Sequence, residues 1–117
     1  MSRIRFALLA AVVAGLVFVA AVSAAPVKLT ATTGPGFTIS LKKGSTKVTK
    51  LKAGKYTISV SDKSNIHNFH LTGPGLNKKT GVGFTGTVKW TVTLKKGTYK
   101  FLCDPHAAIM KGSFKVT

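Results

Sequence analysis

Short runs in which apolar and polar residues alternate dominate the chain from residue 27 onward, and they restrict the fold more than any other feature. The clearest run covers residues 87–94, where one face carries Val88, Trp90, Val92 and Leu94. Strict alternation over this length is typical of a β-strand with one buried face. Glycine and proline punctuate the runs, as at Gly34-Pro35-Gly36, so the chain turns often.

The same pattern predicts about eight strands, at residues 27–32, 37–41, 47–51, 56–61, 66–72, 87–94, 98–103 and 112–116. Residues 76–85 are rich in glycine and lysine and lack clear alternation, so we expect a long connection there. No helical period follows the first 25 residues. The sequence therefore predicts an all-β domain, an antiparallel β-sandwich.

The N-terminal segment has a different composition from the rest. Arg3 and Arg5 precede 20 uncharged residues, 6–25, which end near the small-residue pattern Val22-Ser23-Ala24. This is typical of a signal peptide, and we expect cleavage after Ala24, with residues 1–24 removed and residues 25–117 as the folded domain. A stretch of this length can also cross a bilayer, so a retained membrane anchor is the alternative. In both cases the domain lies outside the cytoplasm, periplasmic or extracellular.

The domain is strongly basic. Of the 18 basic residues only Arg3 and Arg5 are arginines, so residues 25–117 carry 16 lysines against Asp62 and Asp104, a net charge of +14. This charge favours a self-repelling monomer, or an acidic partner. Nucleic acid is a poor match, because arginine is missing from the domain and the lysines are spread along it.

The single cysteine, Cys103, begins the motif Cys103-Asp104-Pro105-His106, and Met110 follows after three more residues. An exported lone cysteine cannot form an internal disulfide, so another role is expected. A thiolate, an imidazole and a thioether on one loop between strands are ligands that suit copper. Each residue alone would more often be core or surface filling; the combination favours a metal site.

A site of this kind needs a second histidine. On a strand covering residues 66–72, His67 would share its face with Phe69 and Leu71, whereas His70 would face the other way. The apolar face should meet the face that carries Cys103. We therefore expect His67, rather than His70, to join Cys103 and His106 as a ligand.

These motifs resemble those of the plastocyanin and pseudoazurin group of cupredoxins, the blue-copper proteins. Residues 98–106 resemble that group's Gly-x-Tyr-x-Phe-x-Cys-x-Pro-His ending, residues 110–116 its Met-x-Gly and closing strand, and His67-Asn68 its His-Asn pair. The likeness covers most of residues 45–117. It implies a Greek-key sandwich, one type 1 copper held by His67, Cys103, His106 and Met110, and an asparagine that braces the cysteine loop.

One spacing departs from the group. Three residues separate His106 from Met110, where plastocyanins usually have four and amicyanins two. A displaced methionine would tune the redox potential and colour without abolishing copper binding. The resemblance also implies an apolar electron gate around His106, formed by Ala107, Ala108 and Ile109, flanked by the turn at residues 73–76 and by lysines that steer an acidic partner. Inward packing of Ile109 is the alternative.

The function that these residues favour is transfer of single electrons between redox proteins, rather than catalysis. A cysteine nucleophile with a histidine base is disfavoured, because Pro105 makes both side chains converge on one point. A copper chaperone or storage protein would need more methionines than Met110. A metal-free basic binding module would leave Cys103 without a purpose.

Overall fold

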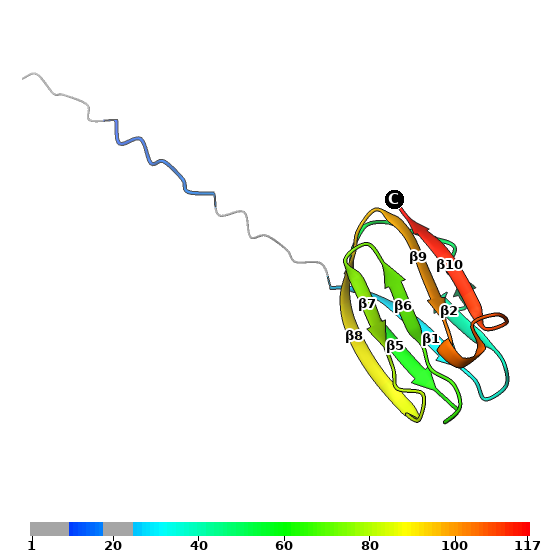
Figure 1. Ribbon diagram of the computed structural model, residues 1–117. Coiled ribbons are helices and arrows are strands. Elements are labelled where there is room, and N and C mark those ends of the chain that lie inside the picture. Colours follow the sequence, from blue (N-terminus) through cyan, green and yellow to red (C-terminus); the bar gives the residue numbers. More distant parts are fainter. Residues whose placement is uncertain (1–9, 18–24) are drawn as a thin grey trace, which may run out of the picture.

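The computed structural model describes residues 10–17 and 25–117 (Figure 1). Residues 25–117 form the expected β-sandwich. Its strands are β1 (Val27–Thr33), β2 (Ile39–Lys43), β3 (Thr46–Lys47), β4 (Lys50–Leu51), β5 (Gly54–Asp62), β6 (His70–Gly73), β7 (Leu76–Lys79), β8 (Gly86–Leu94), β9 (Gly97–Leu102) and β10 (Lys111–Val116). A single turn of 3-10 helix, η1 (Asp104–His106), follows β9.

The strands form two five-stranded sheets, ordered β3-β2-β1-β5-β8 and β4-β10-β9-β6-β7. Most neighbours are antiparallel, but β1 pairs with β5, and β4 with β10, in parallel. Both parallel pairs depart from the purely antiparallel sheets that the sequence predicts. They arise because the chain crosses from one sheet to the other between the paired strands.

The two sheets enclose one apolar core, which runs from Leu29 to Val116 along the sequence. Aromatic rings occupy its centre: Phe69 stacks on Phe101 with ring centroids 5.5 Å apart, and Tyr99 stacks on Phe114 at 5.4 Å. Val88, Trp90, Val92 and Leu94 all face this core, as their alternation predicts. Residues 10–17, the described part of the N-terminal segment before residue 25, are exposed and do not belong to this core.

Three of the expected elements differ in the structure. Residues 47–51 do not form one strand: β3 joins the first sheet and β4 the second, with the buried side chain of Val48 between them. Residues 76–85 are not only a connection, because β7 pairs with β6. The strand expected at residues 66–72 begins only at His70, so His67 lies in the connection from β5.

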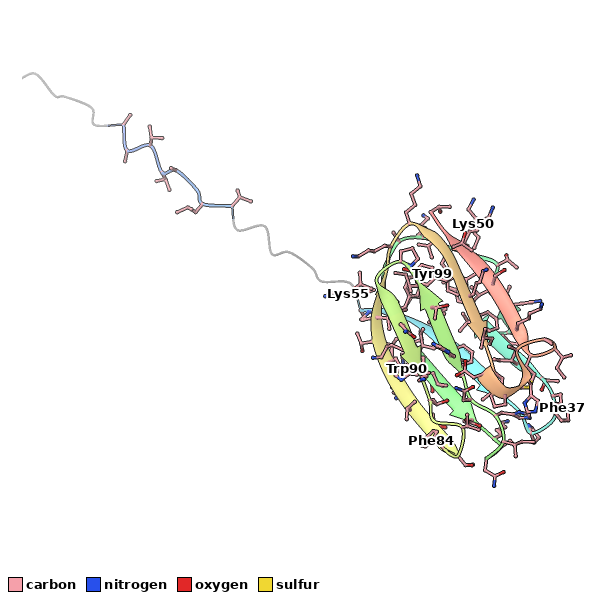
Figure 2. The ribbon with its side chains drawn as sticks, viewed as in Figure 1. Phe37, Lys50, Lys55, Phe84, Trp90 and Tyr99 are labelled. Carbon is pink, nitrogen blue, oxygen red and sulfur yellow. The ribbon has the colours of Figure 1, made fainter. Side chains whose placement is uncertain are left out.

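The sandwich has two distinct ends, which the strand register defines. The copper end, named for the motif it carries, holds the end of β5 at Asp62 and the end of β9 at Leu102, followed by Cys103. The opposite end holds Val27, the start of β5 and the chain terminus at Thr117. In Figure 2, Phe37 and Phe84 mark the copper end, and Lys50 and Lys55 mark the opposite end.

No helix among residues 10–17 and 25–117 is long and apolar enough to span a bilayer. The expected cleavage pattern, Val22-Ser23-Ala24, lies outside the described residues. Cleavage and membrane anchoring of the N-terminal segment therefore stay predictions.

Candidate metal centre

Cys103 follows β9 directly and lies at the start of the turn η1. Its side chain points inward and is fully buried, in phase with Tyr99 and Phe101 on β9. The turn that follows brings His106 back, with the His106 amide donating to the Cys103 carbonyl at 3.0 Å. Pro105 suits the first turn of such a helix, since its fixed φ is already helical and its missing N–H is not needed there.

His67 reaches the same point from the other side of the sandwich end. It is fully buried, although it lies outside any strand. Gly34 makes this placement possible: a Cβ there would lie 3.1 Å from the imidazole Cδ2 atom of His67, and its φ of 72° favours glycine. The histidine that the sequence argument selects therefore lies beside Cys103 and His106, but it lies in a connection and not in the expected strand.

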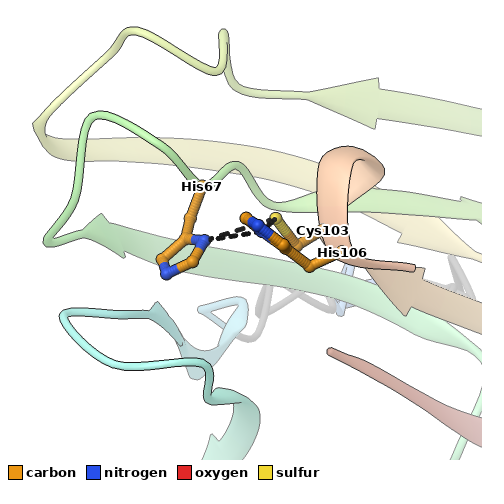
Figure 3. Close-up of side chains that lie close together, drawn as sticks. All are labelled: His67, Cys103 and His106. Carbon is orange, nitrogen blue, oxygen red and sulfur yellow. Dashed lines mark hydrogen bonds between the residues drawn. The ribbon is translucent and has the colours of Figure 1, made fainter. Parts of the chain in front are cut away.

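The three side chains converge (Figure 3). The Cys103 Sγ atom lies 3.7 Å from the His67 Nδ1 atom and 3.6 Å from the His106 Nδ1 atom, and the two Nδ1 atoms are 3.0 Å apart. Metal bonds of about 2.0–2.3 Å to nitrogen and sulfur separate neighbouring ligand atoms by roughly 3–4 Å. The spacing and chemistry of these three donors therefore fit a single copper ion.

Met110 closes the loop that carries these donors. Its carbonyl accepts a hydrogen bond from the Cys103 amide at 3.0 Å, and its amide donates to the His106 carbonyl at 2.9 Å. The Met110 side chain is fully buried. The three-residue spacing from His106 is therefore compatible with a closed loop that returns the methionine to the side of Cys103.

Asn68 braces the loop, as the family resemblance implies. Its backbone amide donates to the Cys103 Sγ atom at 3.4 Å, and its side-chain oxygen accepts from the Asp104 amide at 2.7 Å. Its side-chain nitrogen donates to an Asp104 carboxylate oxygen at 2.7 Å and to the Thr80 carbonyl at 3.1 Å. These bonds hold the Cys103 sulfur and the backbone of Asp104, which follows it.

His70 extends this bracing toward the surface and does not join the donors. Its Nδ1 atom lies 2.8 Å from Asp104, and its Nε2 atom lies 2.6 Å from the side-chain oxygen of Asn77. Burial alone would lower the pKa of His70, but the hydrogen bonds to Asp104 and Asn77 outweigh it and raise that pKa above its ordinary value. Burial alone would raise the pKa of Asp104. The hydrogen bonds from His70 and Asn68 outweigh burial and lower that pKa below its ordinary value.

Asp62, at the end of β5, is a buried polar residue close enough to His67 for their charges to interact. Among the described residues, the Nε2 atom of His67, the Oγ1 atom of Thr33 and one carboxylate oxygen of Asp62 are buried without a hydrogen-bond partner. Burial raises the pKa of Asp62. The hydrogen bond from the Ser64 amide and the charge of His67 lower it, but they do not outweigh burial. His67 therefore has the buried carboxyl group of Asp62 as a neighbour.

Phe37 is a site residue that sequence reasoning missed. Its ring meets the rings of His106 and His67 edge-on, with centroids 4.9 Å and 5.3 Å away, yet its side chain is 56% exposed. The sequence shows only a phenylalanine directly after the turn Gly34-Pro35-Gly36. It does not reveal the contact with the histidines, because that contact joins segments far apart in the sequence. Phe37 shields the histidines from water.

Exposed apolar residues lie near His106, where the resemblance implies an electron gate. Ile109 is 66% exposed, so it does not pack inward. Together with Phe37, Ile66, Ala107 and Ala108 it forms an exposed apolar collar near His106, which is itself only partly exposed. The turn at residues 73–76 does not flank this collar: the Pro74 carbonyl accepts from the Tyr99 hydroxyl near the start of β9, at the opposite end.

Comparisons with known proteins agree with this site. Residues 27–117 match the family described as copper binding proteins, plastocyanin/azurin family. No curated protein matches the chain significantly.

Solved structures show the same fold. Reduced rusticyanin superposes with a TM-score of 0.60 at 24% identity, covering 82% of each chain. A copper(I) form of a mutant amicyanin superposes with a TM-score of 0.52 at 17% identity, covering 78% of this chain and 83% of the amicyanin. The fold, the three converging donors and the family match agree, and the chain belongs to the plastocyanin/azurin family of copper-binding proteins.

Proposed function

We propose that this chain is a type 1 copper protein that carries single electrons between redox proteins outside the cytoplasm. His67, Cys103 and His106 would hold the copper, and Met110 would be a weaker fourth ligand. The observation that carries the proposal is the convergence of one thiol and two imidazoles, with all ligand atoms within 4.8 Å of one another. When bound, copper supplies reversible one-electron exchange between its two common oxidation states.

The residues around the donors support electron transfer better than catalysis or metal delivery. Cys103, His67 and Met110 are fully buried, so a substrate has no access to them. Asn68 bonds to the Cys103 sulfur and to Asp104, which keeps the donors in place as the charge changes. A chaperone would need donors that a receiving protein can reach, and only His106 is partly exposed.

We propose the apolar collar around His106 as the surface that meets redox partners. His106 is the ligand nearest the surface, so a partner docked there is separated from the site by one imidazole ring. Apolar side chains let the two surfaces exclude water without desolvating charges. The net positive charge of the domain favours partners with acidic surfaces at long range, while the collar itself makes a neutral contact.

The test is a copper(II) titration of residues 25–117 followed by visible absorption. We expect an intense band that saturates at one copper per chain and is lost in Cys103→Ser, because the band needs the thiolate. His67→Gln and His106→Gln should lose or transform it as well. His70→Gln is the matched control and should keep it, since His70 is not among the converging donors.

Two results would contradict the proposal. A band that survives Cys103→Ser would mean that the thiolate is not a ligand. Loss of the band in His70→Gln, with retention in His67→Gln, would mean that His70 and not His67 is the ligand.

A further inference from the structure

The charges of the sandwich are unevenly distributed between its two ends. Both acidic residues lie at the copper end: Asp62 ends β5, and Asp104 follows Cys103. In the part of the chain that the structure describes, the one ion pair is formed by His70 and Asp104. The lysines at the opposite end therefore have no aspartate or glutamate beside them; the carboxylate there is that of the last residue, Thr117.

The opposite end contains a groove, which we call the lysine groove. Its lining includes four lysines, at the ends of β2, β4 and β5 and in the turn between the last two: Lys43, Lys50, Lys52 and Lys55. All four are exposed. Lysine carries a compact point charge on a flexible stem, which suits phosphate groups that are free to move.

Neighbouring strands add further charge at this end. Lys28 on β1 pairs with Thr57, one step beyond the groove residue Tyr56. Lys95 and Lys96 follow Leu94, which pairs with Gly54 in the groove wall. Lysines therefore outnumber acidic groups at this end, where Figure 2 labels Lys50 and Lys55.

The path of the chain indicates what this surface faces. Val27, the first residue of β1, lines the lysine groove, so the apolar segment at residues 6–25 joins the domain at this end. If that segment stays in a bilayer, the lysines lie directly beside the lipid headgroups. If it is removed, the new terminal ammonium at Ala25 adds to the same positive surface.

We propose that the lysine end is a docking surface for the phosphate headgroups of an anionic membrane. Docked in this way, the sandwich stands on the membrane with its copper end directed away, so the apolar collar stays free for partners. The attraction is electrostatic and therefore weakens as salt is added. The proposal rests on the distribution of charge and does not depend on the copper assignment.

The test uses the copper-loaded chain from residue 25, because every core side chain lies between Leu29 and Val116. Its partition onto vesicles of phosphatidylglycerol and phosphatidylcholine in equal parts is compared with pure phosphatidylcholine by sedimentation. Each lysine near an anionic surface contributes about fivefold in affinity. The triple variant Lys50→Gln, Lys52→Gln, Lys55→Gln should therefore bind the anionic vesicles roughly 100-fold more weakly.

A matched variant of equal net charge separates the lysine end from charge in general. Lys63→Gln, Lys89→Gln, Lys100→Gln removes three exposed lysines elsewhere and should lose less than about tenfold. Equal losses in the two variants would overturn the proposal, as would the absence of binding to anionic vesicles. Binding to heparin without binding to vesicles would also overturn it and would point to a polyanionic polymer.

Discussion

His70 and Asp104 show how single residues at the copper end link protonation to stability. Both nitrogen atoms of His70 face oxygen atoms, one of Asp104 and one of Asn77. Only the protonated imidazole can donate to both at once. This arrangement explains why the pKa of His70 is raised and that of Asp104 is lowered.

A pH dependence of stability follows from this pair. A raised histidine pKa contributes stability that is complete below the unfolded value of about 6.5 and is lost as pH rises through the folded value. A lowered aspartate pKa contributes stability that is lost as pH falls below about 3.8. The free energy of unfolding, measured in urea, should therefore decrease in the native chain as pH rises above about 6.5.

The variant His70→Gln should lack this decrease, and native and variant should converge at the alkaline end. Thr72→Val, on the same strand, is the control and should keep the native pH profile. An unchanged profile in His70→Gln would show that the pair makes no such contribution.

The sequence predicts the chemistry of the site better than the contacts around it. Cys103, His106 and Met110 share one short loop, so their proximity follows from the chain itself. Phe37 reaches the histidines from a segment far away in sequence, and the bond between His70 and Asp104 joins β6 to η1. Such contacts depend on tertiary packing, which no local pattern records.

At the level of elements, two glycines allow the second sheet to pack its aromatic rings. A Cβ atom at Gly73 on β6 would overlap the ring of Tyr99, and one at Gly112 on β10 would overlap the ring of Phe101. In each case a neighbouring strand presents a ring where the glycine has no side chain. These positions need glycine for space rather than for backbone conformation.

The variant Gly73→Ala should therefore lower the free energy of unfolding by about 1–3 kcal/mol, as over-packed cores do. Gly83→Ala is the matched control, since a Cβ there meets nothing within 4 Å. It should change stability by less than about 0.5 kcal/mol. Chemical denaturation of both variants measures the difference, and an equal effect would refute the steric explanation.

Long alternating strands are the elements that the sequence predicts best. β5, β8 and β9 alternate over six to nine residues, and each was expected within a few residues of its observed bounds. β3 and β4 have two residues each, and β7 exposes alternate residues without an apolar face. These short strands form because they pair with neighbouring strands, so their own residues carry no pattern that would predict them.

For the whole molecule, bound copper would act as a cross-link. His67 lies in the connection between β5 of one sheet and β6 of the other, whereas Cys103 and His106 follow β9. A ligand that binds only the folded state stabilises it, by about 2.7 kcal/mol at a free concentration 100 times the dissociation constant. Urea unfolding with and without copper should show a gain of this size in the native chain and little in Cys103→Ser. An equal gain in both would place the bound copper elsewhere.

Both aspartates lie at the copper end and four exposed lysines line the groove at the other end, so we expect the folded chain to have an electric dipole whose positive pole points away from the copper end. In an external field the molecule approaches a negative surface with its copper end trailing. A gold electrode coated with acid groups would then bind the lysine end of the protein. The length of the sandwich would separate the copper from the gold. A methyl-terminated coating would hold the apolar collar instead, so the same protein would give a current on the uncharged coating and almost none on the charged one.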